Sequence, residues 1–325
     1  MNNWAIISSK TRVFQALVLI ESIIKNDQES KMKILAMDDE SYEILSAFTI
    51  GYGNIDIFHE KNVISSDIKK LKTTRKYFAY CWTLKSVFCS YLMEYVPSDD
   101  FISYVDSDIL FLGNVSAYLS KIQYSTFFVA EEHHIPKEAG IEIHKLKEIV
   151  GNFNSGFISF KNNNEGRKTL NWWEGKCLES CELNAQVFGD QKYLNEMPEL
   201  FTEVVTERSI PLNVGPWNIL KRTWSYEGDI IFSGKHQVLF YHFVGFKLKA
   251  TKEAKFVGNI PVADEAFFES NPSGRLVYER YHHLLVEKMD AVSALFPHFS
   301  GFVDENHPTA DWADYQMQHD ILGLN

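Results

Sequence analysis

The first 110 residues alternate between short apolar runs and amphipathic stretches, and this alternation restricts the possible folds more than any other feature. Strand-like runs occupy residues 4–9, 33–37, 55–58 and 101–105, and stretches with helical spacing occupy residues 13–24, 40–48 and 77–95. In the last stretch, apolar side chains recur at 77, 80, 81, 84, 87, 88, 91, 92 and 95, the stripe of a helix packed on a sheet. We therefore predict an α/β fold with a mostly parallel sheet covered by helices on both faces.

Short polar clusters follow three of the predicted strands. They are Ser8 with Ser9, Asp38 with Asp39, and Asp106 to Asp108. The carboxyl ends of parallel strands share one edge of a sheet, and ligands bind at that edge in folds of this kind. The sequence therefore predicts a ligand site there, although polar strand ends are also common without one.

In the second half of the chain, the patterns that predict strands and helices alternate less regularly. We expect a strand at residues 157–160, a helix at 165–181 and a strand at 238–243. Beyond residue 250, a long amphipathic stretch at 276–296 and a shorter one at 312–321 predict helices. We therefore divide the chain into an α/β domain over residues 1–250 and a C-terminal helical extension over residues 251–325, attached to the first domain as an appendage.

Charge and hydropathy narrow the choice of partners and location. The chain carries 32 Lys and Arg against 43 Asp and Glu, a net charge of −11, which disfavours nucleic acid and, by charge alone, an anionic membrane surface. No apolar run approaches the roughly 18 residues needed to span a bilayer. The start of the chain has no signal-peptide pattern. We therefore expect a cytoplasmic protein, for which peripheral contact with the inner membrane face stays open.

Cysteine and aromatic residues each allow two interpretations. The four cysteines are Cys81, Cys89, Cys177 and Cys181, and they lie inside aromatic-rich amphipathic stretches. Buried free thiols are favoured over a zinc site, because paired Cys-x-x-Cys motifs are missing. The aromatic share of 14% suits stacking on sugar rings, but it suits a packed core better.

The most specific local pattern is Asp106-Ser107-Asp108, two carboxylates one residue apart between hydrophobic segments. Desolvation and mutual repulsion make such a pair costly without a counter-charge. A divalent cation removes both costs, and oxygen ligands suit Mg²⁺ or Mn²⁺. The alternative is a solvated turn with two surface aspartates.

Several ordered segments resemble the glycosyltransferases of family 8 and their bacterial relatives. They are Asp106-Ser107-Asp108, Phe153-Asn154-Ser155-Gly156-Phe157, residues 188–195 around Asp190 and Gln191, Pro216-Trp217-Asn218, and residues 241–247 from Tyr241 to Lys247. Residues 81–85 (CWTLK) resemble the start of the helix before the Asp-x-Asp strand in the bacterial subgroup. The resemblance covers residues 4–250 and implies a GT-A, Rossmann-like domain that uses a nucleotide-sugar donor.

The resemblance also implies roles for individual residues. Asp106, Asp108 and His242 would hold the metal, and the imidazole favours Mn²⁺ slightly over Mg²⁺. Asn154, Asp190 and Gln191 would face the transferred sugar, with retention of configuration. The remaining donor-binding positions would be Ser8, Ser9, Asp38 and Asp39 near the base and ribose, together with Lys85, Ser107, Gly245 and Lys247.

UDP is the commonest donor nucleotide of that family. The acceptor would be a saccharide, a lipid-linked saccharide or a protein, as in polysaccharide biosynthesis. We expect the C-terminal extension to serve acceptor binding or self-association more than donor binding, because it lies outside the donor motifs.

Some of these positions have a plainer interpretation. Asp190 follows a glycine and would suit a helix N-cap, and His242 would suit a packed strand. Arg75 and Lys85 would suit solvated cations. The family also has a lysine six residues after its histidine, whereas this chain has Leu248 there, with Lys247 and Lys249 on either side. Which of these lysines meets the diphosphate stays open.

Two other classes of protein compete with a glycosyltransferase. A phosphohydrolase with an Asp-x-Asp nucleophile would carry the motif near the chain start and a hydroxyl where this chain has Leu110. A non-catalytic protein that binds nucleotide sugars or glycans on the same fold is the second rival. The joint presence of both aspartates, His242 and Asp190 argues against it.

Overall fold

The computed structural model describes residues 1–130, 143–184, 186–207, 211–217, 223–246, 248 and 272–302. Its strands are β1 (Asn2–Ser8), β2 (Lys31–Ala36), β3 (Ile55–His59), β4 (Phe101–Val105), β5 (Ile109–Phe111), β6 (Thr126–Ala130), β7 (Phe153–Lys161), β8 (Val204–Glu207), β9 (Trp224–Glu227), β10 (Ile230–Ser233), β11 (His236–Gln237) and β12 (Phe240–His242). Its helices are η1 (Lys10–Arg12), α1 (Val13–Asn26), α2 (Asp39–Thr49), α3 (Glu60–Val63), α4 (Ser66–Thr74), α5 (Tyr77–Met93), α6 (Val115–Leu119), α7 (Ile143–Val150), α8 (Asn164–Glu179), η3 (Lys192–Asn195), α9 (Met197–Leu200) and α11 (Pro272–Leu295).

A seven-stranded sheet in the order β3-β2-β1-β4-β7-β6-β8 forms the centre of the molecule. Within it β7 is antiparallel to both β4 and β6, whereas the other neighbouring strands pair in parallel. Two smaller antiparallel sheets accompany it, β12 with β5 and β11-β10-β9. The α/β fold with a mostly parallel sheet is therefore confirmed.

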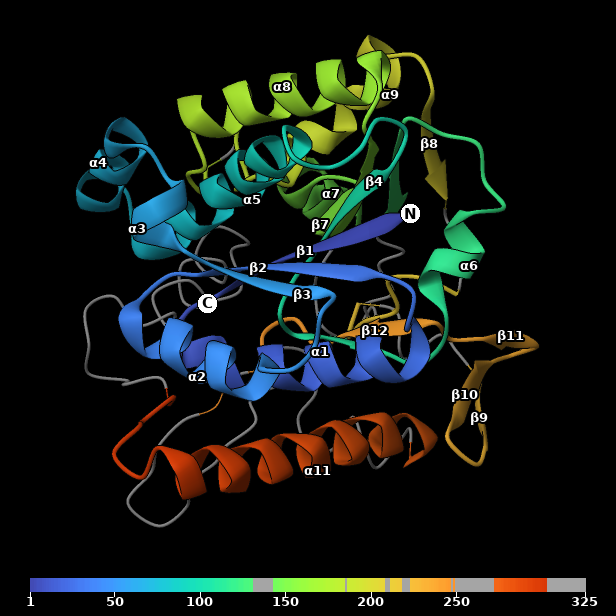
Figure 1. Ribbon diagram of the computed structural model, residues 1–325. Coiled ribbons are helices and arrows are strands. Elements are labelled where there is room, and N and C mark those ends of the chain that lie inside the picture. The colour runs from blue at the N-terminus through green and yellow to red at the C-terminus, as the bar shows by residue number, and fades with distance from the viewer. Residues whose placement is uncertain are drawn as a thin grey trace.

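Helices cover both faces of the sheet, as predicted (Figure 1). Helices α5 and α8 lie on one face, and α1 and α2 lie on the other. Each face has its own buried apolar cluster. One contains Leu84 and Phe88 of α5 with Trp173 of α8, and the other contains Leu17 of α1 with Phe111 and Phe240 of the β5–β12 pair. Most aromatic side chains of the described residues therefore lie within these two apolar clusters or pack against them.

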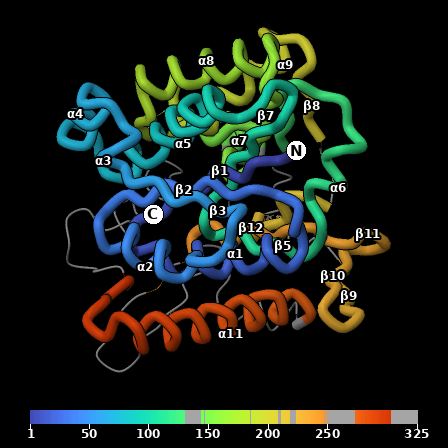
Figure 2. The backbone as a smooth tube through the Cα atoms, viewed as in Figure 1, coloured from blue at the N-terminus to red at the C-terminus, as the bar shows by residue number. Residues whose placement is uncertain are grey.

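Helix α11 lies along α1 on the side away from the sheet (Figure 2). Val277, Tyr281, Leu285 and Val292 of α11 are buried in the same apolar cluster as α1, β5 and β12. An ion pair between Lys288 and Glu21 adds a polar contact between the two helices. The predicted helix at 276–296 is thus confirmed, and it packs tightly on the α/β core. The predicted boundary at residue 250 and the helix at 312–321 fall outside the described residues, so the division into 1–250 and 251–325 stays a prediction.

Three predicted elements differ in extent from what the sequence suggested. Helix α5 ends at Met93, and Tyr95 is 70% exposed, because the chain turns toward Pro97. Strand β7 begins at Phe153, four residues earlier than expected, since it pairs with both β4 and β6. Strand β12 is only three residues long. The described part of the chain contains no helix long and apolar enough to cross a membrane.

The surroundings of the cysteines and of Arg75 decide between the alternative interpretations of these residues. All four thiols are free, and Cys89, Cys177 and Cys181 are buried. Within the described residues no group that could hold a metal contains a cysteine, so the zinc interpretation is wrong there. Arg75 is not a solvated cation, because its guanidinium donates to the carbonyl oxygens of Cys177 and Leu178 at the end of α8.

Candidate active site

Local strand pairing brings together three side chains that are far apart in the sequence. Asp106 follows β4, and its backbone N–H donates to the Gly156 oxygen of β7 at 2.9 Å. Asp108 precedes β5, whose antiparallel partner β12 places His242 opposite Ile109. The Phe243 N–H then donates to the Asp108 carbonyl oxygen at 2.8 Å. His242 therefore lies beside both aspartates.

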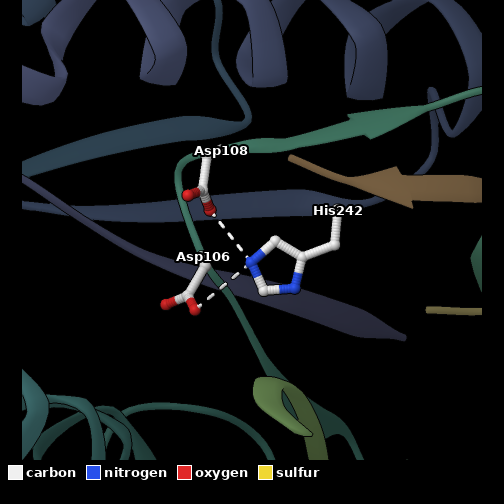
Figure 3. A group of neighbouring side chains, drawn as sticks. All are labelled: Asp106, Asp108 and His242. Atoms are coloured by element: carbon white, nitrogen blue, oxygen red, sulfur yellow. Dashed lines mark ion pairs between the residues drawn. The ribbon is translucent and has the colours of Figure 1, made fainter. Parts of the chain in front are cut away.

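The three side chains point toward one another (Figure 3). His242 Nε2 lies 3.1 Å from Asp108 Oδ1 and 3.7 Å from Asp106 Oδ2. One ligand atom from each residue falls within 4.8 Å of the others. Neighbouring ligands of an octahedral ion with bonds near 2.1 Å are about 3 Å apart, so these residues need only small adjustments to bind one. The set of two carboxylates and one imidazole fits a divalent cation such as Mn²⁺ or Mg²⁺.

Hydrogen bonds determine which nitrogen of His242 faces the aspartates. The Gly156 N–H donates to Asn154 Oδ1 at 2.9 Å, so this atom is an acceptor. His242 Nδ1 lies 3.1 Å from the same oxygen and must therefore carry the proton. Nε2 is left directed at two carboxylates, and among the described residues it has no hydrogen-bond partner. A lone pair in this position is repelled unless a proton or a metal ion lies between, which is the arrangement of a metal ligand.

Gly156 allows the close approach on which this arrangement depends. A Cβ added at residue 156 would lie 2.2 Å from His242 Cε1 and 2.7 Å from Asn154 Oδ1. Any other residue would push the imidazole away from the aspartates. The close contact with His242 therefore explains why residue 156, in the Phe-Asn-Ser-Gly segment that resembles family 8, is a glycine.

Asn154 and Gln191, two of the predicted catalytic residues, are hydrogen-bonded to each other. Asn154 Nδ2 donates to Gln191 Oε1 at 3.1 Å, and Gln191 Nε2 donates to the Val150 carbonyl oxygen at 2.9 Å. Their amides thus form a chain that runs from the backbone to His242. Both are buried, at 6% and 9% exposed.

Lys85 is a buried cation between two carboxylates. Its Nζ lies 3.0 Å from Asp106 Oδ1 and 3.5 Å from Asp190 Oδ2. Burial alone lowers the pKa of Lys85, but Asp106 and Asp190 outweigh burial and raise it. Burial raises the pKa of Asp190, and Lys85 opposes this rise. The interpretation of Lys85 as a solvated cation is therefore wrong.

Asp190 does not cap a helix. The short helix that follows is η3, its N-cap position is Gln191, and no side chain caps it. Asp190 Oδ2 is buried without a hydrogen-bond partner in the described part of the chain, and the oxygen faces Lys85. The Asp190 carbonyl oxygen accepts from Trp173 Nε1 at 3.0 Å, which fixes the backbone at this point. The N-cap interpretation is wrong, and the predicted regular helix start is a 3₁₀ turn.

The predicted polar strand ends do share one edge of the sheet, since β1, β2 and β4 are parallel neighbours. Two of their side chains are already engaged. Asp38 caps α2 by accepting from the Ser41 N–H at 2.8 Å. Asp39 is 85% exposed in its side chain and pairs with Lys61 and His59, which lower its pKa. Ser8 and Ser9 are buried at the end of β1.

Residues after β12 are only partly described. Gly245 has φ +76°, a conformation that favours glycine. Leu248, six residues after His242, is 1% exposed and belongs to the core. Lys247 and Lys249 lie outside the described residues. Ser107 is 8% exposed between the two aspartates.

Two residues beside the three candidate metal ligands do not stand out in the sequence as site residues. Arg12 Nη1 lies 3.8 Å from Asp108 Oδ2. The ring of Trp217 meets that of His242 edge to face, with centroids 5.4 Å apart. Trp217 lies in a segment that resembles family 8, whereas the only sequence signal at Arg12 is its closeness to the end of a predicted strand.

Comparison with known proteins finds relatives over most of the chain. The family model described as glycosyl transferase family 8 matches residues 3–249. The chain is 31% identical over 304 residues to the uncharacterized protein YfnF of Bacillus subtilis (strain 168), covering 92% of this chain and 96% of YfnF. It is 24% identical over 309 residues to YfnD of the same organism, also uncharacterized, covering 94% of this chain and 95% of YfnD.

Solved structures of glycosyltransferases are more distant. The apo form of GlyE from Streptococcus pneumoniae TIGR4 is 15% identical with a TM-score of 0.48, covering 89% of this chain and 63% of that protein. The galactosyltransferase LgtC, in complex with donor and acceptor sugar analogues, is 14% identical with a TM-score of 0.46, covering 88% of this chain and 95% of LgtC.

Proposed function

Because this chain belongs to glycosyl transferase family 8, we propose that it transfers a hexosyl group, with retention, from a nucleotide diphosphate-sugar to a saccharide, lipid-linked or protein acceptor. A UDP-sugar is the first donor to test. The reaction would depend on Mn²⁺ or Mg²⁺ held by Asp106, Asp108 and His242. A cytoplasmic location, with peripheral contact to the inner face of the membrane, belongs to the same proposal.

One observation carries the metal dependence. His242 Nε2 is buried, lacks a hydrogen-bond partner among the described residues and is directed at two carboxylates. The Asn154 oxygen fixes this orientation from the other side of the ring. Such an arrangement is stable with a cation between the three groups, and a bound divalent ion would neutralise charge on the departing nucleoside diphosphate.

The surrounding residues prepare this site in different ways. Asn154 orients His242, and Gln191 supports Asn154 in turn. Lys85 holds Asp106 and Asp190 against their mutual repulsion. We keep Asp190, Gln191 and Asn154 as the candidates nearest the transferred sugar, and Ser8, Ser9, Asp38 and Asp39 as candidates near the base and ribose. For Asp39, its exposure and its ion pairs argue against a ligand contact.

The second candidate function is a protein that binds nucleotide sugars or glycans without catalysis. Membership of glycosyl transferase family 8 excludes the phosphohydrolase alternative. Hydrolysis without acceptor separates the two remaining functions: purified protein is incubated with UDP-glucose, UDP-galactose and UDP-N-acetylglucosamine in the presence of Mn²⁺. We expect slow release of UDP from one donor, which stops when the metal is chelated. Donor binding without any release over a day would favour the non-catalytic function.

Thermal stabilisation identifies the donor before any acceptor is known. A ligand at 100 times its dissociation constant stabilises the folded protein by about 2.7 kcal/mol. We expect one nucleotide sugar to raise the melting temperature only when Mn²⁺ is present. Equal stabilisation in a chelator would contradict the metal dependence.

A further inference from the structure

Arg12 connects the aspartate pair to the loop after β12. Its Nη1 lies 3.8 Å from Asp108 Oδ2 and donates to the Phe246 carbonyl oxygen at 3.3 Å. The buried Gln15 donates to the same carbonyl at 3.0 Å. The planar guanidinium of an arginine matches the geometry of phosphate oxygens, which it binds through two parallel hydrogen bonds. The Arg12 side chain is 24% exposed, whereas that of Lys85, the cation paired with Asp106 and Asp190, is 6% exposed.

Tyr281 of α11 packs against the loop after β12, where its ring contacts those of Phe243 and Phe246. Its ring stacks on Phe243 with centroids 3.8 Å apart and an interplanar angle of 6°. Phe243 in turn donates its N–H to the Asp108 carbonyl. The Tyr281 hydroxyl is buried and has no hydrogen-bond partner in the part of the chain that the structure describes. Burial raises the pKa of Tyr281, the charge of Asp108 raises it further, and Arg12 opposes this rise.

The net charge around the two aspartates depends on Arg12. The described ion-pair network holds three carboxylates (Asp106, Asp108 and Asp190) and two cations (Lys85 and Arg12), which leave one net negative charge. A divalent metal ion would turn this into one net positive charge. Without Arg12 the metal-loaded network would be neutral. Arg12 therefore decides whether the loaded site attracts an anion.

We propose that Arg12 and the hydroxyl of Tyr281 form an anion subsite beside Asp108, which binds the diphosphate of the donor and makes helix α11 part of the donor site. This inference rests on the proposed function, because the anion is the leaving group of the donor. Arg12 supplies a second cation on the side of the aspartate pair opposite Lys85. The unpartnered hydroxyl supplies a neutral donor from a helix that the donor motifs do not include.

The test uses inorganic pyrophosphate, which contains no base or sugar. Calorimetry measures the affinity of the full chain for Mn²⁺ alone and then for pyrophosphate with Mn²⁺ present. We expect Arg12→Gln to weaken pyrophosphate binding about 10- to 100-fold, the range of a charge-assisted hydrogen bond, and Arg12→Lys to restore part of it. The affinity for Mn²⁺ alone should stay equal or rise in Arg12→Gln, because a cation beside Asp108 opposes a second one.

Tyr281→Phe should weaken pyrophosphate binding about 3- to 10-fold, since one neutral hydrogen bond is lost. Tyr278→Phe is the matched control: it lies one turn away on the same helix, and its hydroxyl lies 2.9 Å from that of Tyr241. It should leave pyrophosphate affinity unchanged.

Two outcomes would overturn the subsite. One is wild-type pyrophosphate affinity in both Arg12→Gln and Tyr281→Phe. The other is an equal loss of Mn²⁺ and pyrophosphate affinity in Arg12→Gln, which would mean that Arg12 only positions the loop. If the wild-type protein binds pyrophosphate but not Mn²⁺, the proposed metal-dependent function fails while the subsite is still tested, because the Arg12→Gln loss is expected without metal too.

Discussion

The two aspartates of the candidate metal site have different surroundings. Asp106 is bound by Lys85 of α5, on one face of the sheet, at 3.0 Å, and the lysine side chain is 6% exposed. Asp108 is approached by Arg12, just before α1 on the other face, at 3.8 Å, and the arginine side chain is 24% exposed. The Lys85 side also contains a second buried carboxylate, Asp190. The Arg12 side contains the loop after β12 and the aromatic face of α11.

The different exposure of Lys85 and Arg12 indicates that the two cations have different roles. Lys85 is buried and lies between the partly exposed Asp106 and the buried Asp190, so it stabilises the fold and sets the geometry of Asp106. Arg12 is more exposed than Lys85 and lies 3.8 Å from Asp108, at the edge of ion-pair distance. On our proposal, Lys85 compensates charge within the folded chain, whereas Arg12 binds the incoming anion.

The largest expected effect is on stability, from Lys85→Met. Removing one partner of a buried ion pair costs about 3–5 kcal/mol, because the remaining charges stay buried and uncompensated. Urea denaturation should show this loss in the free energy of unfolding. Arg12→Gln is the matched control, with an expected cost of about 0–1 kcal/mol, since its pair is partly exposed. Similar costs for the two variants would remove the distinction between the two sides.

Asp108→Asn should lower turnover about 10²- to 10³-fold, the usual cost of losing one electrostatic stabiliser of a transition state. The amide keeps the shape of the side chain but removes a charged metal ligand, so Mn²⁺ affinity should fall with turnover while the circular dichroism spectrum stays that of the wild type. Asp229→Asn is the control, and it should be fully active because Asp229 is exposed and pairs with Lys25 and Arg280, outside the proposed site. An Asp108→Asn variant with wild-type Mn²⁺ affinity would contradict the assignment.

Asn154→Ala should weaken Mn²⁺ binding about 10- to 100-fold, the typical cost of removing a group that orients a metal-bound histidine. The variant deletes the acceptor of the His242 Nδ1 proton without touching a ligand. Titration of the metal checks this directly. If Mn²⁺ affinity is unchanged while turnover collapses, Asn154 faces the sugar instead of positioning His242.

The smallest expected effect on binding comes from Gln191→Ala. If Gln191 acts at the sugar, turnover should fall while affinity for free UDP changes less than about threefold, since the lost interaction belongs mainly to the transition state. Steady-state kinetics and calorimetry with UDP separate these quantities. A parallel fall in Mn²⁺ affinity would instead place Gln191 in the chain that orients His242 through Asn154.

The sequence predicted the frame of the site well, because strand ends in a parallel sheet follow from periodicity alone. Strand β4 has the predicted bounds, and α5 begins at the predicted residue and ends two residues early. The aspartates and His242 lie together, as the family resemblance implied. Lys85 was misread as solvent-exposed, although it falls between the apolar positions 84 and 88 on a buried helix. The position of Lys85 in this apolar pattern therefore indicates that its side chain is buried.

Other parts could not be predicted because they depend on contacts across the whole chain. Nothing local in residues 272–295 indicates that Tyr281 stacks on the loop after β12. The sequence therefore predicts acceptor binding or self-association for the extension, more than donor binding, and our proposed subsite revises that expectation. The ion pair of Arg12 with Asp108 joins residues 96 positions apart by way of tertiary packing. The hydrogen bond that fixes His242 requires the Asn154 amide orientation, which only the Gly156 N–H reveals.

We propose that Asp106, Asp108 and His242 bind one metal ion, with His242 Nε2 as a ligand. Pulsed electron paramagnetic resonance of the Mn²⁺-loaded protein detects such a ligand, because a directly bound imidazole nitrogen couples to the electron spin. We predict a ¹⁴N coupling in the wild-type protein that disappears in His242→Ala, while Mn²⁺ affinity falls less than in Asp108→Asn, since a neutral ligand is lost. A bound Mn²⁺ without nitrogen coupling, or a coupling that persists in His242→Ala, would rule out His242 as a ligand.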